Sequence, residues 1–128
     1  MKFENHSLLI SIDAFLDEKM QNVREQQVLI DKEVAVILEI SLEQLQQKIR
    51  DNINRFPEEF MFALNKKEII KIFPQGIKRK KIYAFTWGGL MMLAGLINTK
   101  RAINIHLQLI RSYGKGIIDR FNFADEDI

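Results

Sequence analysis

Three polar side chains in one short segment are spaced so that a helix would present them together, where they could recognise nucleic-acid bases. Gln44, Gln47 and Arg50 follow one another at intervals of three residues, and Asn54 stands four residues further on. The amides of glutamine and asparagine can pair with adenine through two hydrogen bonds, and an arginine guanidinium can pair with guanine. A helix that carries such groups fits the major groove of double-stranded DNA. The alternative is an ordinary solvent-facing side of an amphipathic helix, which two acids in the same segment favour.

A dense run of positive charge stands ahead of an apolar segment in the second half of the chain. Such a run can bind phosphate groups by charge alone, independently of base sequence. The alternative is a charged turn that keeps an edge strand soluble, but four consecutive cations exceed what that needs. We therefore expect phosphate contacts here. The cations are Lys78, Arg79, Lys80 and Lys81, with Lys66, Lys67 and Lys71 as further candidates.

The net charge of +2 hides an uneven distribution along the chain. Residues 1–59 hold 7 lysines and arginines against 12 acids, whereas residues 60–118 hold 11 against the single acid Glu68. A folded domain with this second half should project a positive field over part of its surface, as a protein that binds a polyanion requires. The alternative is a solvated face that serves only solubility.

Catalytic and metal-binding chemistry has little basis in this sequence. The chain holds two histidines and no cysteine, and its carboxylates are not paired for acid–base work. We therefore expect no enzyme, no metal and no cofactor. The absence of cysteine fits a reducing compartment and the apolar start is too short for a signal peptide, so we expect a cytoplasmic protein. Residues 82–98 lack charge over 17 residues, too few for a comfortable membrane span, and predict a buried helix.

A pair of helices would position the polar residues described first. Asp31 is expected to be the N-cap of the first helix, and Ser41 with Gln44 predicts a capping box at the start of the second. Two short helices joined by a three-residue turn predict a helix-turn-helix at about 31–54. The buried stripe of the second helix is expected to consist of Leu42, Leu45, Ile49 and Ile53.

The rest of the chain predicts one α+β domain, small and winged-helix-like, built around this helix pair. Compact apolar runs predict strands, and segments preceded by Asn65, Thr86 or Thr99 predict helices with polar caps. The strands are expected at about 23–30, 60–64 and 82–86. The helices after the pair are expected at 66–73, 87–97 and 99–113.

The expected organisation is a single domain with a segment on either side. Leu8, Ile12, Phe15 and Leu16 have helical spacing and predict a short amphipathic helix before the domain. The three parts are an N-terminal extension at 1–22, a DNA-binding domain at 23–118 and an acidic tail at 119–128.

Two further features are interpreted as packing. Gly88 and Gly89 follow a strand but lack the lysine and the glycine spacing of a phosphate-binding loop, so we expect close packing beside Trp87. His106 is expected on the buried side of the last helix, with Ala102, Ile110 and Tyr113 near it, rather than as a metal ligand.

Four segments together resemble a known family of domains. They read VLID at 28–31, NINRFPEEFMFAL at 52–64, YAFT at 83–86 and RAINI at 101–105. Over about residues 23–115 the chain resembles the phage-type N-terminal DNA-binding domain named after open reading frame six, a relative of the KilA N-terminal domain. Members occur in phage antirepressors and in bacterial proteins of phage or mobile-element origin. The resemblance implies DNA binding, often in regulation.

The chain departs from the family pattern in its loops. Glu25 stands where the family commonly has glycine, and Trp87-Gly88-Gly89 replaces the usual Glu-Gln-Gly. These departures concern loop geometry more than the helix pair.

The leading hypothesis is sequence-specific binding of double-stranded DNA by a phage- or mobile-element-derived transcriptional regulator or antirepressor. The alternative is a protein-interaction module that captures a repressor or forms a homodimer through the apolar 99–113 helix. RNA binding ranks third because no platform of exposed aromatic residues is evident. The candidate DNA-binding residues are Gln44, Gln47, Arg50, Asn54, Arg55, Lys78, Arg79, Lys80 and Lys81.

Overall fold

A four-stranded antiparallel sheet runs through the middle of the computed structural model, which describes residues 14–112. The strand order is β1-β2-β4-β3, and Phe85 of β4 lies opposite both Leu29 of β2 and Met61 of β3. This confirms the α+β class, which is compatible with a small winged-helix-like domain, and the strands expected near 60–64 and 82–86. The strands are β1 at Gln21–Val23, β2 at Gln26–Ile30, β3 at Met61–Ala63 and β4 at Tyr83–Phe85.

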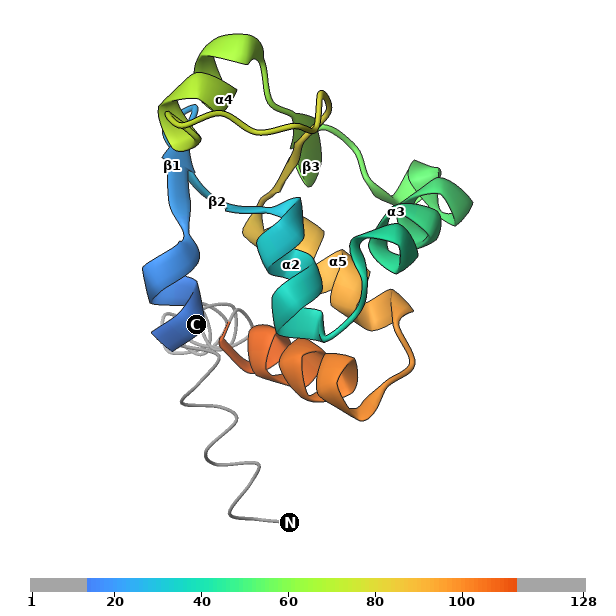
Figure 1. Ribbon diagram of the computed structural model, residues 1–128. Coiled ribbons are helices and arrows are strands. Elements are labelled where there is room, and N and C mark those ends of the chain that lie inside the picture. Colours follow the sequence, from blue (N-terminus) through green and yellow to red (C-terminus); the bar gives the residue numbers. More distant parts are fainter. Residues whose placement is uncertain (1–13, 113–128) are drawn as a thin grey trace, which may run out of the picture.

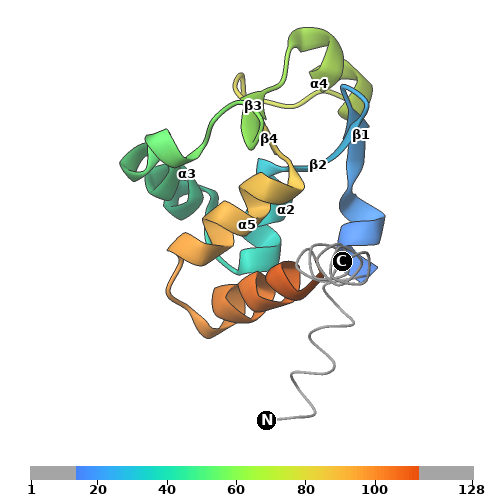
Figure 2. The same cartoon turned by 180° about the vertical axis from the view of Figure 1, so that it is seen from behind.

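The helices lie on both sides of this sheet. Helix α4 lies at one end of the molecule and the helix at 100–112 lies towards the other, with α2 and α5 between that helix and the sheet and α3 to one side (Figures 1 and 2). Residues 14–19 and 100–112 are helical as well. The remaining helices are α2 at Asp31–Leu38, α3 at Leu42–Asp51, the 3₁₀ turn η1 at Ile53–Arg55, α4 at Lys66–Ile72 and α5 at Trp87–Leu96.

Strands β1 and β2 form a hairpin where a single strand at 23–30 was expected. Val23 lies opposite Gln26, so the turn consists of Arg24 and Glu25, whose φ angles are 55° and 63°. Two consecutive left-handed residues match the twist of the flanking strands and give the two-residue hairpin turn that Asn-Gly usually signals. The expectation was wrong because this chain uses two charged residues there, and no glycine marks the turn.

The sheet separates two hydrophobic clusters. Successive side chains of a strand point to opposite sides of the sheet. Because Val28, Leu29 and Ile30 are all buried, this part of β2 is buried on both faces. Leu29 packs with Phe85 and the helices α2, α3 and α5, whereas Val28 and Ile30 pack with Phe62 on the side of α4. A strand buried on both faces explains the continuous apolar run at 28–30.

The start of α5 is fixed by a close approach to Phe60. Thr86 caps the helix as expected, since its Oγ1 accepts a hydrogen bond from the Gly89 N–H. A Cβ atom at Gly89 would collide with the carbonyl oxygen of Phe60, and one at Gly88 would lie 2.8 Å from the Phe60 ring. Close packing of the two glycines is confirmed, with Phe60 as the partner. The uncharged stretch at 82–98 contains β4 and α5 instead of a single helix. Within residues 14–112 no helix is long and apolar enough to cross a membrane.

The helix at 100–112 buries Ala102 as expected, but the rest of its buried face differs from the one expected. Ala102, Ile105 and Leu109 are buried, whereas Ile110 is 43% exposed and His106 is half-buried beside Gly95. The expectation placed the core face one position too far along the helix. The Thr99 cap is confirmed by a 3.1 Å hydrogen bond from the Ala102 N–H to its Oγ1. Leu8, Ile12, Tyr113 and the acidic tail lie outside the described residues.

Candidate nucleic-acid interface

The second helix of the pair begins at the predicted capping box. Ser41 Oγ accepts a 3.0 Å hydrogen bond from the Gln44 N–H, and Gln44 Oε1 accepts a 2.8 Å bond from the Ser41 N–H. Between the helices Glu39 adopts a left-handed φ of 56°, which turns the chain within three residues. Leu45 and Ile49 then bury one side of α3 in the core. Two short helices joined by a three-residue turn are therefore present within the predicted range of 31–54.

The opposite side of α3 is exposed and linked by hydrogen bonds. Arg50 Nη2 donates to Gln47 Oε1 at 2.8 Å, and Gln47 Nε2 donates to Asp51 Oδ1 at 2.8 Å. Both Gln47 and Arg50 are exposed to solvent. The side chain of Gln44 is engaged in the cap instead, so its amide is less free for another partner than sequence reasoning assumed.

Helix α3 ends earlier than expected, at Asp51. The Asn52 side chain donates a 2.9 Å hydrogen bond to the Lys48 carbonyl, and the chain continues into η1. Ile53, expected in the buried stripe, is 55% exposed because η1 does not continue the rotation of the helix. Asn54 and Arg55 are exposed in η1. They follow α3 directly in the chain, and Arg55 also lines a cleft with Met91 and Met92 of α5.

Asp31 does not cap α2 but holds an ion pair across the fold. The N-cap position is Ile30, and Asp31 is the first helical residue, with 1% of its surface exposed. Its carboxylate accepts bonds of 2.9 and 2.7 Å from the two terminal nitrogens of Arg79 and one of 3.1 Å from the Tyr83 N–H. The hydrogen bonds to Asp31 raise the pKa of Arg79 above its ordinary value. A buried carboxylate needs such a partner more than an exposed helix end needs a cap.

This ion pair changes the interpretation of the cationic run at 78–81. The Arg79 guanidinium is bound in the fork geometry that satisfies both carboxylate oxygens. Lys78, Lys80 and Lys81 are exposed on either side of it. Arg79 therefore anchors the segment against α2, while its neighbours face solvent.

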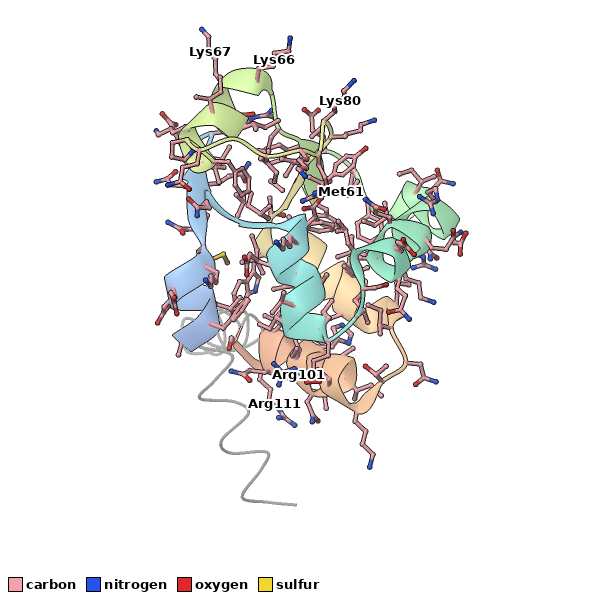
Figure 3. All side chains as sticks on the ribbon, in the orientation of Figure 1. Met61, Lys66, Lys67, Lys80, Arg101 and Arg111 are labelled. Atoms are coloured by element: carbon pink, nitrogen blue, oxygen red, sulfur yellow. The ribbon has the colours of Figure 1, made fainter. Side chains whose placement is uncertain are left out.

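Lysines from two elements gather at one end of the molecule. Figure 3 shows Lys66 and Lys67 on α4 and Lys80 on the following loop, all pointing away from the body. Lys71 is exposed on α4 as well. The loop lies between α4 and α3 in both ribbon views (Figures 1 and 2). We call the exposed side chains of Lys66, Lys67, Lys71, Lys78, Lys80 and Lys81 the lysine surface.

The single acid of residues 60–118 is neutralised within the fold. Glu68 completes the predicted cap of α4 by accepting a 2.8 Å bond from the Asn65 N–H. It also accepts bonds of 2.9 and 3.1 Å from Arg24 in the hairpin turn. The hydrogen bond from Arg24 lowers the pKa of Glu68, and the same bond raises the pKa of Arg24. Glu68 therefore subtracts little from the positive field of the lysine surface.

Sequence reasoning missed the anchoring role of Arg24 and Arg79, and of a third arginine. Arg101 donates a 2.7 Å hydrogen bond to the Ile37 carbonyl and lies 3.3 Å from a Glu39 oxygen, where it covers the C-terminus of α2. Arg24 and Arg79 find their acids 44 and 48 residues away. No local pattern signals partners at such separations. Within residues 14–112 no group of three potential metal ligands occurs.

These elements define a small α+β domain in which an exposed polar helix face stands near a cationic surface. The chain belongs to the ORF6N domain family, whose sequence model matches residues 18–96. The family match suggests a phage-related protein and confirms the resemblance to the domain named after open reading frame six. The match includes β1 and stops before the helix at 100–112. Comparison with curated proteins and with solved structures found no match.

Proposed function

We propose that this protein binds double-stranded DNA in a sequence-specific manner, as a phage- or mobile-element-derived transcriptional regulator. In this proposal α3 enters the major groove and the lysine surface contacts the phosphate backbone beside that groove. Membership of the ORF6N family supports the proposal, since the resemblance to that family implies DNA binding. The expectation of a protein without catalytic activity is part of the same proposal.

The observation that carries the proposal is the positive charge that the lysine surface exposes. Its six lysines are exposed, and Glu68, the acid in their midst, is bound by Arg24. A surface of this kind attracts the phosphate backbone and supplies affinity that does not depend on sequence. Arg79 is not counted among the phosphate contacts, because its guanidinium is bound to Asp31.

Base recognition is assigned to Gln47 and Arg50, with Asn54 and Arg55 at the end of the helix. The bonds among Arg50, Gln47 and Asp51 lie in solvent, where a hydrogen bond contributes only about 1 kcal/mol net. They can therefore be exchanged for base edges at small cost. Arg50→Ala should reduce preference for one site, by about 1–3 kcal/mol of discrimination at one base pair, with little loss of binding to other sequences.

The deciding experiment measures binding to random-sequence duplexes over a range of salt concentrations. Replacing Lys78, Lys80 and Lys81 by alanine should weaken binding to all sequences and reduce the slope of log affinity against log salt by about 3. Lys100→Ala is the matched control, because Lys100 is an exposed lysine at the start of the helix at 100–112. If no duplex binds even at low salt, the proposal is wrong.

A second candidate function is a protein-interaction module, and one surface favours it. A cleft of about 680 Å³ runs along α5, with Met91 and Met92 in its wall and His106 on its far side. Methionine side chains adapt to varied partners. Light scattering after size exclusion tests for a homodimer, and capture of a repressor that survives the three lysine replacements would favour this function over DNA binding.

A further inference from the structure

A second groove lies within the lysine surface, between α4 and the loop that follows it. It has a volume of about 560 Å³, and half of the residues that form its walls are aliphatic or aromatic. Ile70 stands 66% exposed beside it, and Lys66 and Lys80 stand at its rim. The walls are formed by Lys66, Ile69, Ile70, Phe73, Gly76, Ile77, Arg79 and Lys80.

The chemistry of this groove exceeds what phosphate binding requires. A phosphate backbone needs only the cations, and it offers no apolar side chain to cover Ile70 or fill the space beside Phe73. A large aliphatic side chain left in water forgoes the favourable free energy that its burial would contribute. The groove fits a peptide that combines an apolar anchor with neighbouring carboxylates.

The last residues of this chain have that chemistry. Phe121 and Phe123 are followed by the acids at 125–127, and residues 119–128 carry a net charge of −3. We propose that the segment at 121–128 docks in the groove of its own chain, with a phenylalanine against Ile70 and the acids near Lys66 and Lys80.

The chain is long enough for this contact. The helix at 100–112 ends on the same side of the molecule as residues 14–19, from which β1 leads to α4 (Figures 1 and 2). Residues 14–24 cover about 25 Å as one short helix and one extended strand. Residues 113–121 can span roughly 30 Å when extended. The tail can therefore reach α4 without displacing the core.

Docking of the tail would regulate the proposed function, and this part of the inference rests on that function. The acids would occupy Lys66 and Lys80, which are also assigned to phosphate. Tail and DNA would then compete, so neutralising the tail should tighten DNA binding. The docking itself requires only the groove and the tail.

The test uses the full chain without DNA and follows release of the C-terminal peptide by chymotrypsin, which cleaves after Phe121 and Phe123. Ile70→Asp should accelerate this release about tenfold, because it removes the apolar anchor and repels the acids. Val36→Asp is the matched control, since Val36 is 52% exposed on α2, away from the groove. Both sites are exposed, so circular dichroism should show unchanged folding.

Equal release from the wild type and Ile70→Asp would overturn the proposal, as would equal acceleration by Val36→Asp. Release that slows as protein concentration rises would also overturn it, because contact within one chain does not depend on concentration.

A second measurement separates this inference from DNA binding. Replacing Asp125, Glu126 and Asp127 by their amides should accelerate peptide release and raise affinity for a random duplex several-fold. If release accelerates but no duplex binds, the proposed function fails and the docking stands. If DNA binds with unchanged affinity and release is unchanged, the docking fails and the proposed function stands.

Discussion

At the scale of single residues, the ion pair between Asp31 and Arg79 is tightly constrained by the groups around it. Asp31 is 1% exposed, and its carboxylate receives bonds from Arg79, Tyr83 and the following backbone N–H. Replacing a buried ion pair as a whole can be nearly neutral, but removing one partner leaves a buried charge without compensation. Arg79 was predicted to contact phosphate because its neighbours in the sequence are all lysines.

Arg79→Ala should therefore lower the free energy of unfolding by roughly 3 kcal/mol, because Asp31 would stay buried without its cationic partner. Urea unfolding followed by circular dichroism measures this loss. Lys80→Ala is the control, since Lys80 is exposed in the same loop and its replacement should change stability by less than about 0.5 kcal/mol. Similar stabilities of the two variants would contradict the structural role given to Arg79.

At the scale of elements, the hairpin of β1 and β2 shows how a strained turn is held in place. Arg24 and Glu25 are both left-handed, yet Arg24 bonds to Glu68 of α4 and lies 4.1 Å above the Phe62 ring. Contacts with β3 and α4 therefore fix a turn that its own residues disfavour. The caps of α3 and α4 were predicted correctly from Ser41 and Asn65, because each capping hydrogen bond joins residues three positions apart.

Glu25→Gly should stabilise the protein by about 1 kcal/mol, because glycine adopts a positive φ without the steric cost that a side chain imposes. The resemblance to the ORF6N family agrees, since glycine is common there. Thermal unfolding measures the change. Gln26→Gly is the contrasting control, and it should destabilise the hairpin because Gln26 is already in the strand. A lower melting temperature for Glu25→Gly would contradict the turn geometry.

The bond between Arg24 and Glu68 should make stability depend on acid pH. Because the folded state lowers the pKa of Glu68 below its ordinary value of 4.5, the contribution is present above that value and is lost as pH falls through the folded pKa. Glu68→Gln should cost about 1 kcal/mol at pH 7, and the difference from the wild type should shrink below pH 4.5. Urea unfolding at pH 7 and pH 3 tests this, and a constant difference would contradict it.

At the scale of the whole molecule, the sheet separates α4 and its lysines from the helices α2 and α5 (Figures 1 and 3). The helix pair, the fold class and the strands at 61–63 and 83–85 could be predicted from local periodicity and caps. The role of Arg79 and the buried face of the last helix could not. Both depend on which distant element packs against the residues concerned, and the local sequence does not indicate that element.

The concentration of positive charge on one surface should govern the rate of association with DNA. If the lysine surface steers a duplex, the association rate constant should fall at least tenfold as salt rises from about 20 to 200 mM. Stopped-flow fluorescence with a labelled duplex measures it. Replacing Lys78, Lys80 and Lys81 by alanine should flatten this dependence, whereas Lys100→Ala should leave it unchanged. Equal slopes for all three proteins would contradict electrostatic steering by this surface.

The ion pair between Asp31 and Arg79 also has a consequence for how the sequence can evolve. A mutation of Arg79 alone leaves the buried Asp31 without its partner, and a mutation of Asp31 alone leaves the half-buried guanidinium without its acceptor. Either single change should therefore reduce stability, and the two positions should change together along lineages, to a reversed pair or to two apolar residues. The adjacent lysines can vary one at a time. The binding strength that we propose for this surface can therefore evolve in small steps while Arg79 keeps the loop in place.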